Sequence, residues 1–299
     1  KTGAGMMDCK KALTNTDGDM DAAVEWLREN GLAKAAKKSG RIAAEGMVAV
    51  DVSEDGKSAS IVEVNSETDF VAKNAEFNEF VDAVAAQAMN SNAADMDAFM
   101  QETWAADPSL TVEQALSSKV ARIGEKLSIR RFEKIAGADL VVSYIHGDGK
   151  IGVLVEAATD VVNDDIKEAL KNVAMQIAAM NPEYISRNDM SADELAKLRE
   201  IIVDSALNDP ATLPKPILNK LIEKAISEKI WSDADIATYE EHKSNMQYLF
   251  NFLSKEAASQ LAELALADRA NIAADKIFNG LVEGRVSKQL KEICLMDQV

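Results

Sequence analysis

The sequence predicts an α+β protein: a small helical module at its start, then two related hairpin-plus-helix subdomains with a long helical insertion. Three observations predict this class. Apolar residues recur at helical spacing over most of the chain. At two places in the chain, a pair of β-rich runs flanks an Asp-Gly dipeptide, which is a strong hairpin signal. The hairpin-plus-helix pattern then occurs a second time, which indicates an internal repeat.

The composition limits the kind of function. The chain has 299 residues, of which 47% are hydrophobic, and this is enough for a large core and two or three domains. Its formal net charge is −17, whereas contacts to nucleic-acid phosphates need clustered lysine and arginine. We therefore expect a protein or small-molecule partner and no nucleic-acid partner.

The two cysteines, Cys9 and Cys294, stand near opposite ends of the chain, and no Cys/His spacing fits a zinc site or a disulfide framework. We expect a reduced, cytoplasmic compartment. No apolar run approaches the ~20 residues of a membrane helix, and no signal peptide opens the chain, so we expect no membrane partner. Because the chain begins with Lys1 rather than Met, we expect a trimmed start.

Residues 1–46 are predicted to form the helical module. Two amphipathic stretches flank "TNTDGD", which supplies turn residues and a helix cap from either Asp17 or Asp19. Met6 and Met7 are adjacent on the first stretch. Such a pair usually belongs to a core, but one of the two must point outward, and an exposed methionine suits an adaptable protein-binding surface.

Residues 47–135 are predicted to form the first core subdomain. Its two β-rich runs surround Asp55-Gly56, and a helix of about residues 74–90 follows. We expect further helices over residues 93–135, with Thr111 and Gln114 as a capping box.

Residues 136–299 are predicted to form the second core subdomain. A hairpin pattern over residues 140–157 surrounds Asp148-Gly149, and an amphipathic helix follows. "DGKSASIVEV" and a helix ending "AAQAMN" in the first subdomain match "DGKIGVLVEA" and a helix ending "QIAAMN" here. The pattern is almost wholly helical over about residues 186–285, and we place a helical insertion at about residues 186–275.

No catalytic site is evident. Gly147–Gly152 fits G-x-G-x-x-G, but that fingerprint requires a following helix, and "VLVEA" is β-type, which favours a hairpin turn. His146 beside this turn is better explained as a turn residue than as a catalytic base, and His242 lies in a helical pattern. We expect no enzyme activity and no cofactor.

The most informative segment is "VNSETDFVAKN", residues 64–74, where an apolar run meets a polar strand-to-helix elbow. Two interpretations stay open. In one, Phe70 folds back onto the helix and Asp69 caps that helix. In the other, Phe70 protrudes as a rigid wedge that inserts into a partner.

Blocks of sequence that keep one order along nearly the whole chain closely resemble bacterial translation elongation factor Ts. They are "TGAGMMDCKKAL", "AAEG", "VNSETDFVAKN", "IGEKLSIRR", "SYIHGDGKIGVLVE", "MNPEYI" and "VEGRVSKQLKEICLMDQ". Together these blocks are far more specific than any short motif.

The resemblance implies a guanine-nucleotide exchange factor that binds elongation factor Tu in its GDP-bound and nucleotide-free states and performs no bond chemistry. It implies that residues 1–46 are a ubiquitin-associated-like domain without most of its first helix. It also implies that the elbow displaces Mg²⁺ from the partner, and that the helical insertion, longer than in compact members, is used for self-association. The implied displacing residues are Thr68, Asp69, Phe70 and Val71, and the implied further contacts are Met6, Met7 and His146.

Two other functions remain as alternatives. The helical module could make the protein an adaptor for ubiquitin-like or other peptides, or residues 147–152 could serve an enzyme. Peptide capture by residues 1–46 alone would support the adaptor, and nucleotide binding by the isolated chain would support the enzyme.

Overall fold

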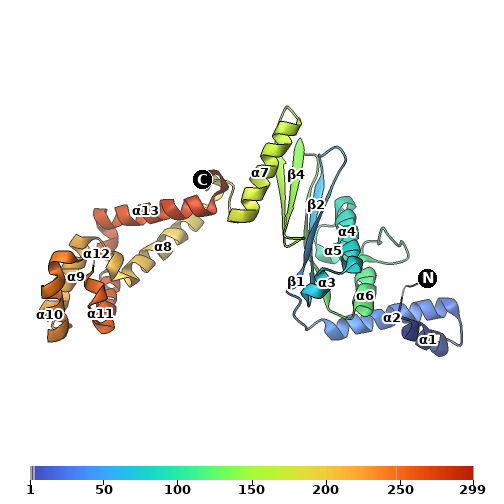
Figure 1. Ribbon diagram of the computed structural model, residues 1–299, viewed down its shortest axis with the longest axis horizontal. Helices are drawn as coiled ribbons and strands as arrows, with labels where there is room; N and C mark the ends of the chain where they lie inside the picture. The colour runs from blue at the N-terminus through green and yellow to red at the C-terminus, as the bar shows by residue number, and fades with distance from the viewer. Residues whose placement is uncertain (1, 3, 247, 299) are drawn as a thin grey trace. The chain divides into compact units, whose positions relative to one another are not determined.

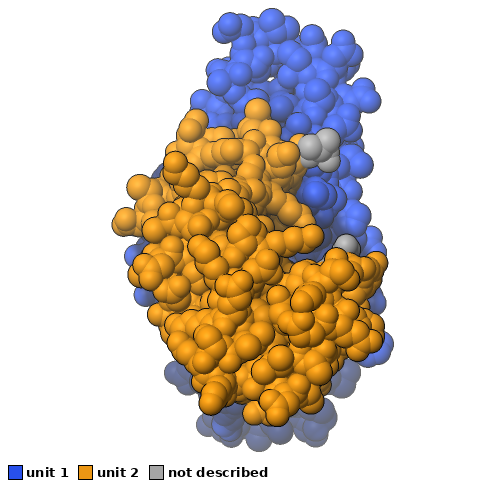
Figure 2. Space-filling view, turned by 90° about the vertical axis from the view of Figure 1, so that its left-hand side faces the viewer, with its two compact units in different colours: residues 1–180 blue, residues 181–299 orange. Residues whose placement is uncertain are grey.

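The computed structural model describes residues 2, 4–246 and 248–298. The chain forms two compact units, residues 1–180 and residues 181–299, which Figure 2 shows in separate colours. Each unit has its own hydrophobic core. Among the described helices, none has the length and apolarity needed to cross a lipid bilayer.

The first unit begins with two helices, α1 (Met6–Asn15) and α2 (Met20–Lys38). The turn between them uses Asp17 and Gly18 at positive φ. Asp19 then caps α2, because its carboxylate accepts hydrogen bonds from the amides of Asp21 and Ala22, each at 2.9 Å. Of the two predicted caps, Asp19 is the one used.

A three-stranded antiparallel sheet follows, in the order β1 (Glu45–Val52), β2 (Ala59–Ser66) and β3 (Leu127–Ile135). Between β2 and β3 the chain forms α3 (Asp69–Ala72), α4 (Ala75–Asn90), α5 (Met96–Gln101) and α6 (Val112–Ile123). The helix predicted over residues 74–90 is confirmed. Its apolar stripe, with Phe77 and Val84 fully buried, packs on the sheet face that carries Val62 and Val64, as Figure 1 shows.

The expectation of helix over residues 93–135 is wrong for its last part. The predicted capping box of Thr111 and Gln114 is present, but α6 ends at Gly124, whose φ of 89° stops the helix. The chain then enters β3, where Leu127 and Ile129 alternate into the core. Because β2 is the central strand, its second edge needs a partner for its hydrogen bonds, and β3 supplies it.

The second predicted hairpin is also present, as β4 (Leu140–His146) and β5 (Ile151–Ala157), and α7 (Asp164–Met180) follows it. Its turn holds Gly147, Asp148 and Gly149 at positive φ, and β5 follows directly. The glycines therefore serve a hairpin turn, as predicted. The hairpin packs against the β1–β2–β3 sheet, and α7 packs on β4 and β5 (Figure 1).

Gly152 shows why this hairpin needs a residue without a side chain. A Cβ at this position would lie 2.4 Å from Cγ1 of Val48 and 2.9 Å from Cδ1 of Ile61. Gly152→Ala is therefore expected to lower the free energy of unfolding by about 1–3 kcal/mol, the usual cost of overpacking. Chemical denaturation measures it. Gly284→Ala, where a Cβ meets nothing within 4 Å, is the control; equal stability of both variants would contradict the packing described.

The second unit is helical throughout the residues described. Its helices are α8 (Ala192–Asn208), α9 (Lys215–Ser227), α10 (Asp233–His242), α11 (Lys255–Ala267), α12 (Arg269–Ala274) and α13 (Lys276–Ile293). Short 3₁₀ turns lie between them at Pro210–Thr212, Lys243–Asn245 and Leu249–Asn251, before α8 at Arg187–Asp189 and after α13 at Leu295–Asp297. Its core includes Trp231, whose indole N–H donates to the carbonyl of Ala257 at 3.2 Å. The helical prediction for residues 186–285 is confirmed.

Candidate functional site

The elbow between β2 and α4 contains a one-turn helix, α3. Thr68 caps α3, because its hydroxyl accepts a hydrogen bond from the amide of Val71 at 3.4 Å. Asn74 caps α4 by accepting from the amide of Glu76 at 2.8 Å. Asp69 caps neither helix, so the interpretation that gave it this role is wrong.

Phe70 is exposed over 82% of its surface. The side chains of the next two residues point inward: Val71 packs against the core of the first unit, and Ala72 is buried. A single helical turn cannot send three consecutive side chains inward. Phe70 therefore does not fold back onto the helix, which leaves a large apolar side chain at the tip of the elbow.

Asp69 carries its charge beside Phe70. Its carboxylate forms an ion pair with Lys73 at 3.1 Å. The hydrogen bond and charge of Lys73, with a smaller contribution from Lys150, hold the pKa of Asp69 below its ordinary value. An exposed ion pair of this kind adds little stability, but Asp69 remains negatively charged at neutral pH.

The β4–β5 turn lies at the same end of the sheet as the elbow. Glu45 at the start of β1 is paired with Ser66 at the end of β2, and the ammonium of Lys150 lies 2.7 Å from the Glu45 carboxylate. His146 precedes this turn and is exposed, with its Nδ1 2.8 Å from the hydroxyl oxygen of Tyr144. The structure thus brings the segment of His146 close to the elbow.

Met6 and Met7 lie on α1, which packs against α2. Both are exposed, over 87% and 64% of their surfaces. The expectation that one of the pair must point outward is met by both. Exposed methionines fit a protein-binding surface, for the resemblance-based function and for the adaptor alternative alike.

The structure adds contacts that the sequence analysis missed. Glu125 accepts hydrogen bonds from the hydroxyl and the amide of Thr68, at 2.7 and 3.0 Å. Glu67 accepts one from the amide of Lys126 at 2.5 Å. The sequence predicts helix over residues 93–135, and a helical pattern assigns no role to residues 125 and 126. Recognition of a strand from Leu127 onward would have placed them in a loop, where side chains are free to hold other segments.

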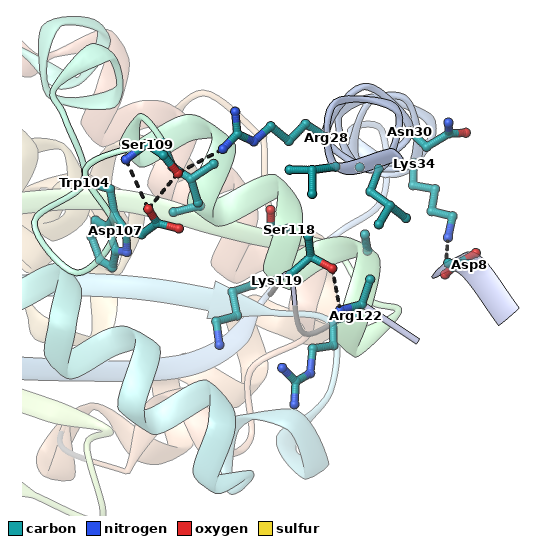
Figure 3. A pocket seen from close by; sticks show the side chains of 18 of the residues that line it. Asp8, Arg28, Asn30, Lys34, Trp104, Asp107, Ser109, Ser118, Lys119 and Arg122 are labelled. Atoms are coloured by element: carbon teal, nitrogen blue, oxygen red, sulfur yellow. Dashed lines mark hydrogen bonds and ion pairs between the residues drawn. The ribbon is translucent and has the colours of Figure 1, made fainter. Parts of the chain in front are cut away.

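A pocket of about 640 Å³ in the first unit lies between the N-terminal helices, α4 and α6 (Figure 3), and none of the residues described in its lining belongs to the elbow. Its lining contains no histidine, cysteine or tyrosine. Two of its cations make contacts within the lining: Arg28 donates to the Ser109 hydroxyl at 2.9 Å, and Lys34 pairs with Asp8 at 2.9 Å. The Arg28 contact joins α2 to the loop before α6, and the Lys34 pair joins α2 to α1, so these contacts hold the N-terminal helices in place.

Among the described residues, no group of three or more His, Cys, Asp or Glu side chains is arranged to hold a metal ion. What the elbow presents is a capped turn with an exposed aromatic ring and a carboxylate, and such a surface suits contact with another protein.

Known proteins resemble this chain over most of its length. A family model described as "Elongation factor TS" matches residues 67–240. Elongation factor Ts of Clostridioides difficile (strain 630) is 48% identical over 229 residues, which is 76% of this chain and 75% of the relative. That of Clostridium tetani (strain Massachusetts / E88) is 48% identical over 256 residues, covering 81% and 84% of the two chains. That of Halothermothrix orenii (strain H 168) is 46% identical over 233 residues, covering 78% and 77%.

The matched region contains the elbow, all of β3 to β5, the helices from α4 to α9 and most of α10. The identity is well above 30%, and it extends over more than two thirds of each relative. The resemblance noted in the sequence blocks is thereby confirmed, and the chain belongs to the elongation factor Ts family, the nucleotide exchange factors of elongation factor Tu.

Proposed function

We propose that this chain promotes GDP release from elongation factor Tu by using the elbow to displace Mg²⁺ and disturb the partner's phosphate site. The observation that carries the proposal is the exposure of Phe70 at 82% on a capped, single-turn helix. A side chain this exposed buries little apolar surface in the free protein and so contributes little to its stability. We infer that this surface is buried in the complex instead.

The mechanism follows from how a GTPase holds its nucleotide. Mg²⁺ and oriented backbone amides bind the phosphates of GDP. A wedge that shifts the helices carrying these ligands removes metal coordination and weakens GDP. By linkage, bound GDP weakens the exchange factor by the same factor, so the chain is expected to bind both the GDP-bound and the nucleotide-free partner.

No bond of the nucleotide is made or broken in this process, and the family is one of exchange factors rather than of enzymes with their own catalysis. We assign Thr68, Asp69, Phe70 and Val71 to the displacing segment. We also propose that His146, near the elbow, and Met6 and Met7 on α1 make further contacts with the partner.

The test is the release of fluorescent GDP from elongation factor Tu with and without the chain. We expect release to accelerate and its rate to reach a plateau as the chain concentration rises. The isolated chain should bind no GDP, GTP or NAD at micromolar concentration in calorimetry, because Gly152 lies within β5 and the glycine turn is followed by this strand rather than by a helix. An unchanged release rate would contradict the proposal, and nucleotide binding by the chain alone would favour the enzyme alternative.

The second unit is proposed to be dispensable for exchange, because the elbow and the β4–β5 hairpin both belong to the first unit. Deletion of residues 186–275 alone would leave α13 without its packing partners, because Phe278 and Val282 are fully buried against the helices removed. A variant that ends after Met180 removes the whole second unit and avoids this exposure. Its plateau release rate is expected to stay within about threefold of the full chain. Circular dichroism checks its folding, and a folded variant without activity would contradict the prediction.

We propose that the second unit carries the self-association that the resemblance implies. Ile201 on α8 is exposed over 66% of its surface, so this helix presents an apolar side chain that a second copy of the chain can cover. Sedimentation of the full chain and of the variant ending at Met180 separates the two cases. Association that persists in the short variant would contradict the assignment.

A further inference from the structure

Two carboxylates fasten the elbow to the loop that precedes β3. The carboxylate of Glu125 accepts both hydrogen bonds that Thr68 can donate, one from its hydroxyl at 2.7 Å and one from its amide at 3.0 Å. In the opposite direction, the carboxylate of Glu67 accepts from the amide of Lys126 at 2.5 Å. We refer to residues 67–68 with 125–126 as the clasp.

The clasp fixes the hydroxyl that caps α3. A threonine hydroxyl has one proton and two lone pairs. Because the Thr68 hydroxyl donates its proton to Glu125, its lone pairs remain free to accept a hydrogen bond from the amide of Val71, at 3.4 Å. Ser66 completes the arrangement by donating to the carbonyl of Thr68 at 3.0 Å. Thr68 therefore links Glu125 by hydrogen bonds to the turn that carries Phe70.

The clasp also extends to the end of α2. The ammonium of Lys126 donates to the carbonyls of Ser39 and Arg41, at 2.7 and 2.8 Å, and Arg41 forms an ion pair with Glu67 at 3.2 Å. The amide of Lys126, and then Arg41, hold the pKa of Glu67 below its ordinary value. Three segments far apart in the sequence therefore meet beside the elbow.

The turn that carries Phe70 depends on such outside support. A single helical turn is unstable in water, because it fixes several backbone angles for very few hydrogen bonds. Phe70 itself is mostly exposed and so adds little packing to the turn. If the support is lost, the turn samples other conformations, and only the fraction that retains the native one can act on a partner.

We propose that Glu125 is a positioning residue for nucleotide exchange: through Thr68 it holds α3 in the orientation that presents Phe70 to the partner. The proposal deepens the function given above and rests on it. It does not require Glu125 to touch elongation factor Tu.

The first measurement uses the full chain and elongation factor Tu loaded with fluorescent GDP, over a series of chain concentrations. Glu125→Ala is expected to lower the plateau release rate by about tenfold, as expected for lost hydrogen bonds to a charged group. The half-saturating concentration should change by less than about threefold, because the other proposed contacts remain. Glu125→Gln, which keeps one acceptor oxygen, should fall between Glu125→Ala and the unchanged chain.

The second measurement is independent of exchange activity. Hydrogen–deuterium exchange of the segment 67–74 is expected to quicken in Glu125→Ala, whereas the segment 77–88 of α4 should keep its protection. Glu102→Ala is the matched control. Glu102 is also half-buried and accepts two side-chain hydrogen bonds, from Gln87 at 3.1 Å and Ser91 at 2.8 Å, but it holds a different loop. Glu102→Ala should leave the plateau release rate and the hydrogen exchange of residues 67–74 unchanged.

The third measurement combines substitutions. If Glu125 acts only by positioning α3, which carries Asp69 as well as Phe70, the two losses should not add: Glu125→Ala should slow release less in the Phe70→Ala background than in the unchanged chain. Fully additive losses in the double variant, or slow release by Glu125→Ala with unchanged hydrogen exchange over residues 67–74, would show that Glu125 acts by another route and overturn the positioning role.

The two single variants distinguish the positioning role of Glu125 from the proposed exchange function. If Phe70→Ala is slow and Glu125→Ala is as fast as the unchanged chain, the positioning role is wrong and the proposed function stands. If Phe70→Ala is itself as fast as the unchanged chain, both are wrong. Should Glu125→Ala fail to fold, the same outcomes are read from Glu125→Gln.

Discussion

Phe70→Ala is expected to slow GDP release from elongation factor Tu by about 30-fold or more, which corresponds to the ~2 kcal/mol that an interface anchor contributes. The melting temperature should stay almost unchanged. The reason is that a side chain exposed over 82% of its surface buries little apolar area in the free protein, and such substitutions usually alter stability by no more than ~0.5 kcal/mol. Stopped-flow release and thermal unfolding of the same variant provide both numbers.

Each alternative outcome has a definite meaning. A large fall in melting temperature would indicate that Phe70 supports the fold, contrary to its exposure. An unchanged melting temperature with unchanged release would exclude the wedge.

Asp69→Ala should likewise slow release with little change in stability, because its ion pair with Lys73 is exposed.

Phe77→Ala is expected to do the reverse: it should lower the free energy of unfolding by about 3–5 kcal/mol, the usual loss for a core phenylalanine. Phe77 is fully buried in α4, seven residues after Phe70, against the first sheet. It lies outside the elbow, so the plateau release rate per folded molecule should be retained below the melting temperature. Denaturant unfolding and release kinetics at low temperature check the two parts.

The pair Phe70 and Phe77 is the sharpest comparison that the chain offers, because the same substitution is made at two sites of opposite burial. If both variants lost stability equally, the exposure described for Phe70 would not hold in solution. If Phe77→Ala remained stable but lost exchange, the active surface would have to include α4.

Much of the local structure follows from short-range chemistry that the sequence displays. The second hairpin was predictable because Asp148 and Gly149 both adopt positive φ, and few other residue pairs do so without strain. Helix α4 was predictable from the spacing of its apolar residues, and the cap of α6 from Thr111 with Gln114. The family was also evident, since its sequence blocks are read without any knowledge of the fold.

The third strand was not predictable in this way. Arg130 and Arg131 are both exposed within β3 and interrupt its alternation, so the segment after Gly124 reads as a continuation of a helical pattern. Its strand conformation is decided by the free edge of β2, which is more than sixty residues earlier in the chain. A strand at the edge of a sheet owes its conformation to its neighbour more than to its own propensity.

The sequence by itself thus determined the hairpin turns, the capping box of α6, the periodic helices and the family. Only the tertiary structure decided that Phe70 is exposed, that Thr68 rather than Asp69 caps the turn, and that Glu125 holds Thr68. The physical reason is that burial and long-range hydrogen bonds depend on which segments meet in space. A motif such as "TDFV" specifies the groups that it offers, whereas a loop 57 residues away in the sequence determines how they are held.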